Sequence, residues 1–272
     1  MKLKAIIFDM DDTLVDWSQR AQDWLSHESM HLERVFEYIA RDVHPISGEA
    51  VFFDAVRKAS RQGWMEAERG LRAPRYGDSI RKALETIGVP PDRIDVDACL
   101  RAADWQIISG VRAFPDALEI LPLLVSHGIN IGMITNSSMP MWVRDRELES
   151  LGLLRFFGDC RLTAADAGYI KPHPAVFEAA LQCVNAQPGE VIFVGDNPEA
   201  DVAGPQAVGM RAVLRIAGQT PPLISGLIIP DGAINSLYEL LPILDSWYPD
   251  WRANGKENGK YAPQPLRTEQ IT

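Results

Sequence analysis

The chain has 272 residues, of which 46% are hydrophobic, and a formal net charge of -10 at pH 7. It is long enough to bury a sizeable core, in one large domain or in two modest ones. The negative charge argues against general binding of nucleic acid or of an anionic membrane, because both need a basic surface. No apolar segment is long enough to suggest a signal peptide or a membrane span. The three cysteines (Cys99, Cys160 and Cys183) form no CxxC pair, so we expect reduced thiols that act as buried filler in a cytoplasmic protein.

Short apolar runs that alternate with helix-like segments predict a parallel sheet. A continuous apolar run is typical of a strand that is buried on both faces, and such alternation indicates a doubly wound α/β fold. A helix predicted over 117–127, with Gly128 as its C-terminal cap, precedes the second run. The four predicted strands span residues 5–8, 129–134, 191–194 and 212–216.

Between the first and second predicted strands the pattern changes to helical periodicity with many charges, broken at Pro45, Gly70 and Pro74. We therefore predict an α/β core formed by residues 1–15 and 112–246, with residues 16–111 inserted as a helical domain. Residues 247–272 are mostly polar and contain few apolar side chains to offset the entropy of ordering, so we expect a flexible tail.

Two aspartates, Asp9 and Asp11, follow the first predicted strand at the sheet edge where such folds bind ligands, and Thr13 completes the pattern Asp-x-Asp-x-Thr. In extended chain the two carboxylates share one face. Carboxylates this close raise one another's pKa unless a cation or a proton intervenes, which suits one ionised nucleophile and one acid/base. A solvated loop with a helix-capping aspartate would have the same residues, so the motif alone leaves both readings open.

Polar residues also follow the second predicted strand and precede a later helix. Thr135 and Asn136, followed by two serines, stand before a helix that Pro140 opens. Hydroxyl and N–H donors in such a place can hold phosphate oxygens, although plain N-capping by serine is the better explanation of this segment by itself. Lys171 begins the Lys-Pro-His-Pro segment before another predicted helix. The chain has seven lysines and 20 arginines, so a lysine here suits a point charge that meets both a carboxylate and a phosphate oxygen. An ordinary surface lysine explains this residue, taken alone, equally well.

The third predicted strand ends in Gly195 and Asp196, and Asn197 is placed to cap the helix that contains Asp201. Glycine allows the backbone to approach closely, while Asp196 offers a hard oxygen ligand of the kind that magnesium prefers. Stabilisation of a helix dipole could explain Asp201, but it does not explain an aspartate at the end of a strand.

Together these segments resemble the four motifs of phosphatases in the haloacid dehalogenase superfamily. The resemblance spans most of residues 3–217, and it places the inserted helical block where this superfamily has its type 1 cap. Two departures are small: Asp12 stands where glycine is common, and His173 where aspartate is common. The matching segments are Asp9-Met10-Asp11-Asp12-Thr13, Thr135-Asn136, Lys171-Pro172, and Gly195-Asp196 with Asp201.

The resemblance implies a Mg²⁺-dependent phosphatase that acts on a small phosphorylated metabolite through a phospho-aspartate at Asp9. Asp11 would protonate the leaving group and then activate water. Thr135, Asn136 and Lys171 would bind the phosphoryl group. The metal would be bound by Asp9, Asp196 and the backbone carbonyl of Asp11, while Thr13 and Asp201 would support the site. Such a site works by in-line positioning and charge neutralisation.

Other activities stay open at this point. A phosphosugar mutase uses the same core residues, whereas a haloacid dehalogenase typically lacks the second aspartate of the first motif. A phosphonate hydrolase would need a Schiff-base lysine from the inserted block, where Lys58 and Lys82 are found, and a non-enzymatic binding module would not need these catalytic residues. His27, Glu28 and His31 also fit H-E-x-x-H, the helical zinc motif of metalloproteases.

Substrate choice in this superfamily is set by cap residues that reach over the core site. Two interruptions of the helical pattern are candidates: residues 42–48 with His44, and residues 72–77 with Arg72, Arg75 and Tyr76. Arginine can bind a carboxylate through two parallel hydrogen bonds. We therefore expect Arg72 or Arg75 to recognise an acidic group of the substrate that is distant from its phosphate.

Overall fold

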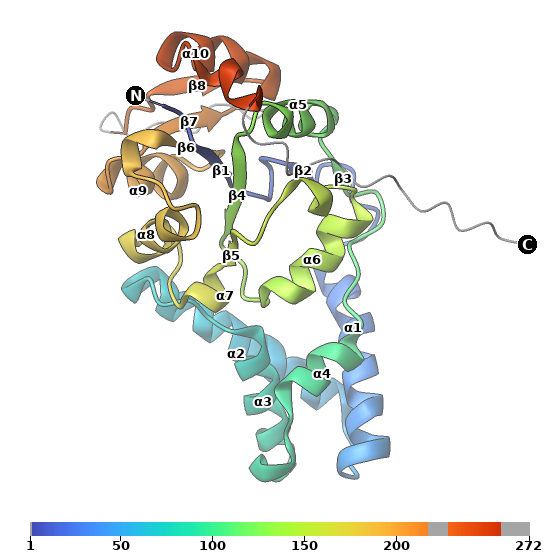
Figure 1. Ribbon diagram of the computed structural model, residues 1–272. Helices are drawn as coiled ribbons and strands as arrows, with labels where there is room; N and C mark the ends of the chain where they lie inside the picture. The colour runs from blue at the N-terminus through green and yellow to red at the C-terminus, as the bar shows by residue number, and fades with distance from the viewer. Residues whose placement is uncertain (1, 217–227, 257–272) are drawn as a thin grey trace, which may run out of the picture.

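The computed structural model describes residues 2–216 and 228–256, and its centre is a six-stranded sheet with helices on both faces (Figure 1). All strand pairs in this sheet are parallel, and the order is β5-β4-β1-β6-β7-β8. The predicted doubly wound α/β fold is confirmed. The strands are β1 (Ala5–Phe8), β4 (Asn130–Thr135), β5 (Arg161–Thr163), β6 (Val191–Gly195), β7 (Arg211–Arg215) and β8 (Gly232–Ile234).

The central strand β1 is buried on both faces, and its side chains alternate between two hydrophobic clusters. Ile6 and Phe8 pack with apolar residues of α5, α6 and α10, while Ala5 and Ile7 pack with those of α8. This alternation is why a strand of four apolar residues fits the middle of the sheet. The flanking helices are α5 (Pro115–Ser126), α6 (Met141–Ser150), α7 (Ala164–Ala167), α8 (Pro174–Cys183), α9 (Gly204–Ala207) and α10 (Leu240–Trp247).

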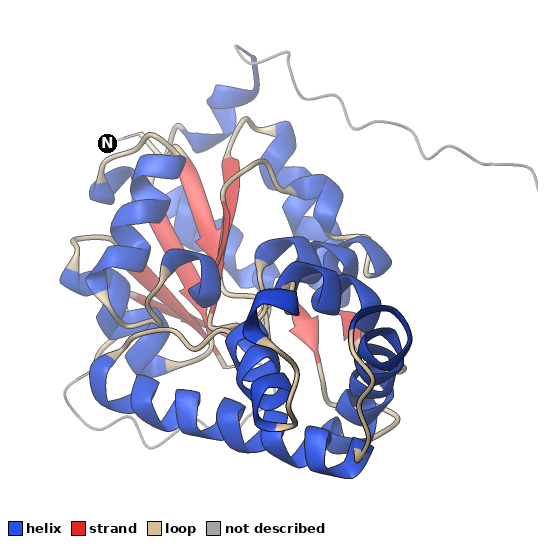
Figure 2. Ribbon diagram, turned by 90° about the horizontal axis from the view of Figure 1, so that it is seen from below, coloured by secondary structure: helices blue, strands red, loops and turns tan. Residues whose placement is uncertain are grey.

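Four helices form a separate bundle beyond one end of the sheet, which we call the helical block (residues 24–103; Figures 1 and 2). The block has its own hydrophobic cluster, which includes Leu32, Phe52 and Ile80. Met139 and Val143, from the sheet-bearing part of the chain, belong to the same cluster, so the block is packed onto the start of α6. Its helices are α1 (Trp24–Tyr38), α2 (Glu49–Gly70), α3 (Tyr76–Thr86) and α4 (Val96–Ala103).

A two-stranded antiparallel ribbon stands where the chain enters and leaves the helical block. It consists of β2 (Val15–Asp16) and β3 (Arg112–Ala113), with Val15 opposite Ala113 and Asp16 opposite Arg112. The guanidinium of Arg112 donates to Asp16 Oδ2 at 3.1 Å. The ribbon therefore lies at the two predicted boundaries of the inserted segment.

Two helix caps and the start of the C-terminal segment can be compared with the sequence predictions. Gly128, with φ of +74°, follows the C-terminus of α5. Asn197 caps the short helix η5 (Pro198–Ala203), which contains Asp201, by accepting from the N–H groups of Glu199 and Ala200 at 3.0 Å. Both capping predictions are confirmed.

The first part of the predicted flexible tail, residues 247–272, differs from the prediction. Trp251 is only 1% exposed and packs in the core. Residues 257–272 lie outside the described part of the chain.

The three cysteines are free, but only Cys99 and Cys160 are buried as expected of filler, whereas Cys183 is exposed. Within residues 2–216 and 228–256, no helix has both the length and the apolar character that a membrane crossing requires.

Candidate active site

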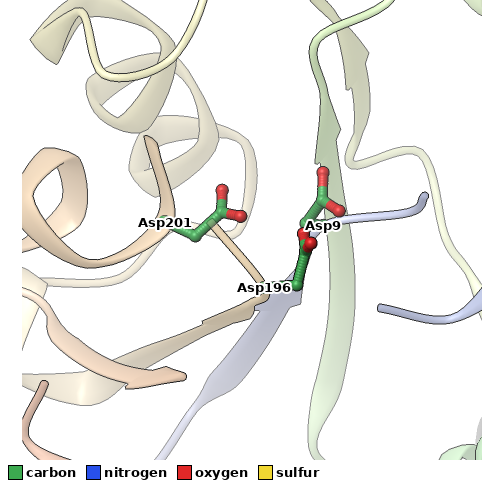
Figure 3. A group of neighbouring side chains, drawn as sticks. All are labelled: Asp9, Asp196 and Asp201. Atoms are coloured by element: carbon green, nitrogen blue, oxygen red, sulfur yellow. The ribbon is translucent and has the colours of Figure 1, made fainter. Parts of the chain in front are cut away.

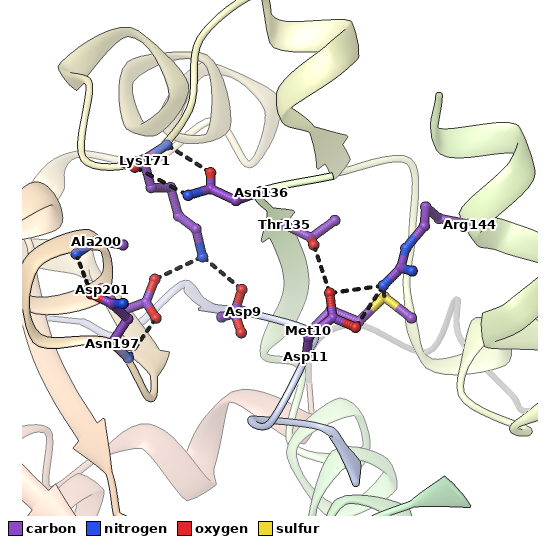
Figure 4. Close-up of polar contacts among 10 residues, drawn as sticks. All are labelled: Asp9, Met10, Asp11, Thr135, Asn136, Arg144, Lys171, Asn197, Ala200 and Asp201. Atoms are coloured by element: carbon purple, nitrogen blue, oxygen red, sulfur yellow. Dashed lines mark hydrogen bonds and ion pairs between the residues drawn. The ribbon is translucent and has the colours of Figure 1, made fainter. Parts of the chain in front are cut away.

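Asp9, Lys171 and Asp201 meet at the carboxyl ends of β1 and β6 (Figure 4). Lys171 Nζ lies 2.6 Å from Asp9 Oδ1 and 2.7 Å from Asp201 Oδ1, and all three side chains are nearly inaccessible to solvent. Burial disfavours the charged ammonium, but the carboxylates of Asp201 and Asp9 outweigh this effect and raise the pKa of Lys171. The lysine is therefore a fixed positive charge next to the proposed nucleophile.

Asn136 holds Lys171 in place through the backbone. Its side-chain oxygen accepts from Lys171 N at 2.7 Å, and its amide donates to Lys171 O at 3.1 Å. The side chain of Asn136 is thus engaged by the protein, which leaves its backbone N–H as the group that could meet phosphate. The neighbouring Thr135 is 1% exposed, and its hydroxyl donates to Asp11 Oδ2 at 3.3 Å.

Asp11 is held by three donors from different parts of the chain. Trp17 Nε1 donates to Asp11 Oδ1 at 2.9 Å, and Arg144 Nη2 reaches both carboxylate oxygens, at 2.7 and 2.9 Å. With Thr135, these contacts fix the orientation of the carboxylate. Sequence reasoning missed both Trp17 and Arg144, since neither stands in one of the four motifs.

Arg144 is itself buried and links Asp11 to the helical block. Its Nη1 lies 2.6 Å from Glu147 Oε2, and Glu147 Oε1 accepts from Trp105 Nε1 at 2.9 Å. Burial alone would lower the pKa of Arg144, but the charges of Asp11 and Glu147 outweigh it and raise that pKa. Trp105 lies two residues after α4, the last helix of the block, so one polar chain runs from the end of the block through α6 to the proposed acid/base.

Asp9, Asp196 and Asp201 form an acidic cluster (Figure 3), each offering an oxygen within 4.8 Å of the others. Burial raises the pKa of Asp9 to about 8, and Asp201 and Asp11 add to this while Lys171 opposes it. Burial, followed by Asp201 and Asp12, raises the pKa of Asp196 to about 6. The site is short of positive charge, and its donors are hard oxygens, so the residues present fit a divalent cation such as Mg²⁺.

Backbone geometry explains two positions around the cluster. A Cβ atom at Gly195 would overlap the carboxylate of Asp201, so this strand end needs glycine. Asp12 has φ of +59°, a left-handed conformation that glycine adopts freely and that aspartate tolerates better than most residues. Aspartate can therefore stand where the superfamily commonly has glycine.

Thr13 and His173 are the two remaining residues of the motifs. Thr13 is fully buried, and its hydroxyl has no hydrogen-bond partner among the described residues. His173 accepts from Ala175 N through Nδ1 at 3.2 Å and stacks on Tyr169, with ring centroids 3.9 Å apart. His173 thus caps α8, a task that aspartate performs equally well.

The structure does not bring all of the proposed specificity residues to the site. Arg72 and Arg75 line a separate cavity between α2 and α3; Arg72 lies over the ring of Tyr169, and Arg75 Nε donates to Ala165 O at 3.0 Å. These contacts attach the helical block to the sheet-bearing part of the chain. A cleft over Asp11 lies between the sheet edge and the helical block. His44, which follows the short π-helix η1 (Ile39–Val43), does not line this cleft. Tyr76 does line that cleft.

The H-E-x-x-H segment is engaged in the packing of the helical block. His27 Nε2 and His31 Nδ1 lie 2.8 Å from the carbonyl oxygens of Gln106 and Ala103, respectively. Glu28 accepts from Tyr76 Oη at 2.9 Å and pairs with Arg57 at 3.0 Å. Every member of the motif therefore has a structural partner, and a zinc protease is not favoured.

Comparison with known proteins agrees with this geometry. Residues 3–209 match the haloacid dehalogenase-like hydrolase family. The chain belongs to this family. The matched range contains all four motifs and the whole helical block.

The chain is similar in sequence to proteins named as phosphatases. It is 28% identical over 258 residues to glyceraldehyde 3-phosphate phosphatase of Pyrococcus furiosus, covering 94% of this chain and 96% of the relative. It is also 28% identical over 225 residues to ribulose-1,5-bisphosphate 5-phosphatase of Halopiger xanaduensis, covering 77% and 83%. Among solved structures, 2-haloacid dehalogenase of Pseudomonas syringae superimposes with a TM-score of 0.58 at 24% identity, covering 90% and 99%. The last likeness is one of fold alone.

Proposed function

We propose that this protein is a Mg²⁺-dependent phosphatase that hydrolyses a small phosphorylated metabolite through a phospho-aspartate at Asp9. The observation that carries the proposal is the convergence of Asp9, Asp11, Thr135 and Lys171 at one sheet edge, although they come from separate parts of the chain. Asp11 favours phosphate over halide chemistry, because the first step of phosphate transfer needs an acid for the leaving oxygen.

In the first step, an Asp9 oxygen forms a bond to phosphorus while the bond from phosphorus to the leaving oxygen breaks. Protonated Asp11 donates its proton to that leaving oxygen, so the alcohol departs neutral. Lys171 Nζ, 2.6 Å from Asp9 Oδ1, is close enough to the attacking atom to balance charge on a phosphoryl oxygen. Thr135, whose hydroxyl donates to Asp11 in this structure, would turn it toward a second phosphoryl oxygen.

In the second step, water attacks phosphorus and the bond from Asp9 to phosphorus breaks, which releases phosphate. Asp11, now ionised, takes the proton of that water. The contacts from Arg144 and Trp17 orient Asp11 for both transfers.

Asp9, Asp196 and the backbone carbonyl of Asp11 would hold the Mg²⁺ ion, with Asp201 orienting Lys171. When bound, the ion supplies positive charge that neutralises the phosphoryl oxygens and keeps Asp9 ionised at neutral pH. This charge matters at Asp9, because burial raises the pKa of its carboxyl group.

The helical block would act as the cap of this site. It packs onto the start of α6 and contributes side chains to the cleft over Asp11. The two phosphatases named above act on phosphorylated sugars by their names, which supports a small phosphorylated metabolite as the substrate class. We also propose a cytoplasmic location, where such metabolites occur.

The test is release of inorganic phosphate from 4-nitrophenyl phosphate and from a panel of phosphorylated metabolites. We expect activity with Mg²⁺, loss of activity in excess chelator, and recovery when Mg²⁺ is restored. Asp9→Asn should fold like the wild type, judged by circular dichroism, and show no measurable turnover. A folded Asp9→Asn protein with full activity would end the nucleophile assignment.

A further inference from the structure

A cleft of about 480 Å³ lies between the sheet edge and the helical block, and its floor includes Asp11 and Asn136. This volume suits a ligand considerably larger than phosphate. Four of the seven tryptophans of the chain line it: Trp17, Trp24, Trp64 and Trp105. The cleft therefore has large aromatic walls that a ligand could contact.

Two of the aromatic walls are fixed by their polar ends. Trp105 Nε1 donates to Glu147, and its ring stacks on His31 with centroids 4.5 Å apart, while Tyr76 Oη donates to Glu28. Both side chains are almost fully buried. They form a rigid apolar surface whose orientation does not depend on a ligand.

The other rings remain partly open to the cleft. Trp24, the first residue of α1, lies 5.4 Å from Trp105 between ring centroids, yet 45% of it is exposed. Trp17 and Trp64 are half-buried. The exposed part of an indole offers a large flat surface to a ligand ring.

Part of the polar lining of the cleft is already engaged within the protein, while Arg20, Ser60 and Ser138 also line it. Glu28 is occupied by Tyr76 and Arg57, and Arg144 by Asp11 and Glu147. A leaving group rich in hydroxyls needs free donors and acceptors, because each unmatched polar group weakens binding. The four indole rings and Tyr76 give the cleft flat apolar walls, which suit a ring.

We propose that the substrate is a phosphomonoester whose leaving group carries a flat aromatic ring, held between Trp24 and Trp64 above Asp11. The inference rests on the phosphatase function proposed above and names its substrate class. The ring stacks on the tryptophans, which places the ester oxygen over Asp11 and the phosphoryl group toward Asp9.

The test compares benzyl phosphate with sn-glycerol 3-phosphate, using the full chain in Mg²⁺ and measuring kcat/KM. Both esters release a primary alcohol, so the bond that breaks is alike and the ring is the main difference. We expect about a tenfold or greater preference for benzyl phosphate. A purine nucleoside 5′-monophosphate places its ring farther from phosphorus. A preference for either aromatic ester over glycerol 3-phosphate supports the proposal. The aromatic ester with the higher kcat/KM then shows how far from phosphorus the cleft holds the ring.

Variants of Trp24 separate stacking from packing. Trp24→Leu should lower the ratio of kcat/KM for benzyl phosphate to that for glycerol 3-phosphate by about fivefold, whereas Trp24→Phe should keep most of it. Trp142, which is 38% exposed on α6 and does not line the cleft, provides the matched control: Trp142→Leu should leave the ratio unchanged. Thermal melts establish that each variant is folded.

Three results would overturn the inference. Equal kcat/KM for aromatic and polyol phosphates in the wild type would reject it, as would equal losses on both substrates in Trp24→Leu, which would make the ring a packing element. In either case turnover of 4-nitrophenyl phosphate would leave the phosphatase function intact. Absence of turnover with 4-nitrophenyl phosphate as well would reject that function and the inference with it.

Discussion

Replacement of Arg144 by methionine should destabilise the protein and impair proton transfer by Asp11. The guanidinium lies 2.7 Å from Asp11 Oδ1 and 2.6 Å from Glu147 Oε2, and the Glu147 side chain is only 1% exposed. Removal of one partner of a buried ion pair costs about 3–5 kcal/mol, because the other charge is left without compensation. The variant should therefore melt about 10 °C below the wild type at pH 7.

Protonation of Glu147 leads to a loss in the free energy of unfolding of similar size. Without Arg144, Glu147 can escape its uncompensated charge by taking up a proton, and its ordinary pKa is 4.5. Keeping such a carboxyl protonated at pH 7 costs about 3 kcal/mol. This cost shrinks as the pH falls toward 4.5, since the folded variant binds a proton that the unfolded chain lacks at higher pH. The stability deficit of Arg144→Met should therefore be smaller at pH 5.5 than at pH 7.

Urea or thermal unfolding at the two pH values measures both effects. Arg144→Met combined with Glu147→Gln is the control, because the amide removes the charge and still accepts from Trp105 Nε1. We expect the double variant to recover most of the lost stability while kcat stays low, since Asp11 still lacks its orienting donor. Wild-type stability of Arg144→Met at pH 7, or a double variant no more stable than the single one, would refute the reasoning.

Three further outcomes follow from the same geometry. Asp11→Asn should slow turnover about 10²–10⁴-fold while changing Mg²⁺ affinity only slightly, as measured by calorimetry, because the proposed metal contact is a backbone carbonyl; a large loss of affinity would contradict the division of roles. Gly195→Ala should lower both Tm and kcat, since the new Cβ overlaps the Asp201 carboxylate, and an unchanged kcat would reject the need for close approach. Burial lowers the pKa of His31 from 6.5 to about 4, so the unfolded chain binds its proton first and stability should fall by about 2 kcal/mol between pH 7 and pH 5. Melts of His31→Gln should show a weaker pH dependence.

The interior strands of the sheet were predictable, whereas its edges were not. β1, β4, β6 and β7 are buried and appear as apolar runs, which the sequence displays directly. β5 and β8 stand at the two ends of the sheet order and are three residues long. An edge strand is paired on one side only and needs less apolar character, so its pattern is too short and too mixed to identify.

The proposed catalytic residues were predictable from the sequence, whereas the residues that orient them were not. Asp9 and Asp196 directly follow apolar strands, so their place at the sheet edge could be predicted. Arg144 and Glu147 are three residues apart on α6, and the sequence shows only that they share a helix face. That this face is buried against Asp11 and Trp105 depends on how the helical block packs, which no local pattern encodes. The direction of Arg72 and Arg75 depends on the same packing.

The ribbon of β2 and β3 makes the helical block exchangeable as a unit. Because Val15 pairs with Ala113 and Asp16 with Arg112, the chain departs from the sheet-bearing part and returns to it at adjacent points. A segment inserted between neighbouring ends places little geometric demand on its host, so its length and helices can change while the sheet keeps its register. Evolution, or an engineer grafting another block onto the same two strands, could thus alter the molecule that is recognised while the chemistry proposed for Asp9 is inherited unchanged.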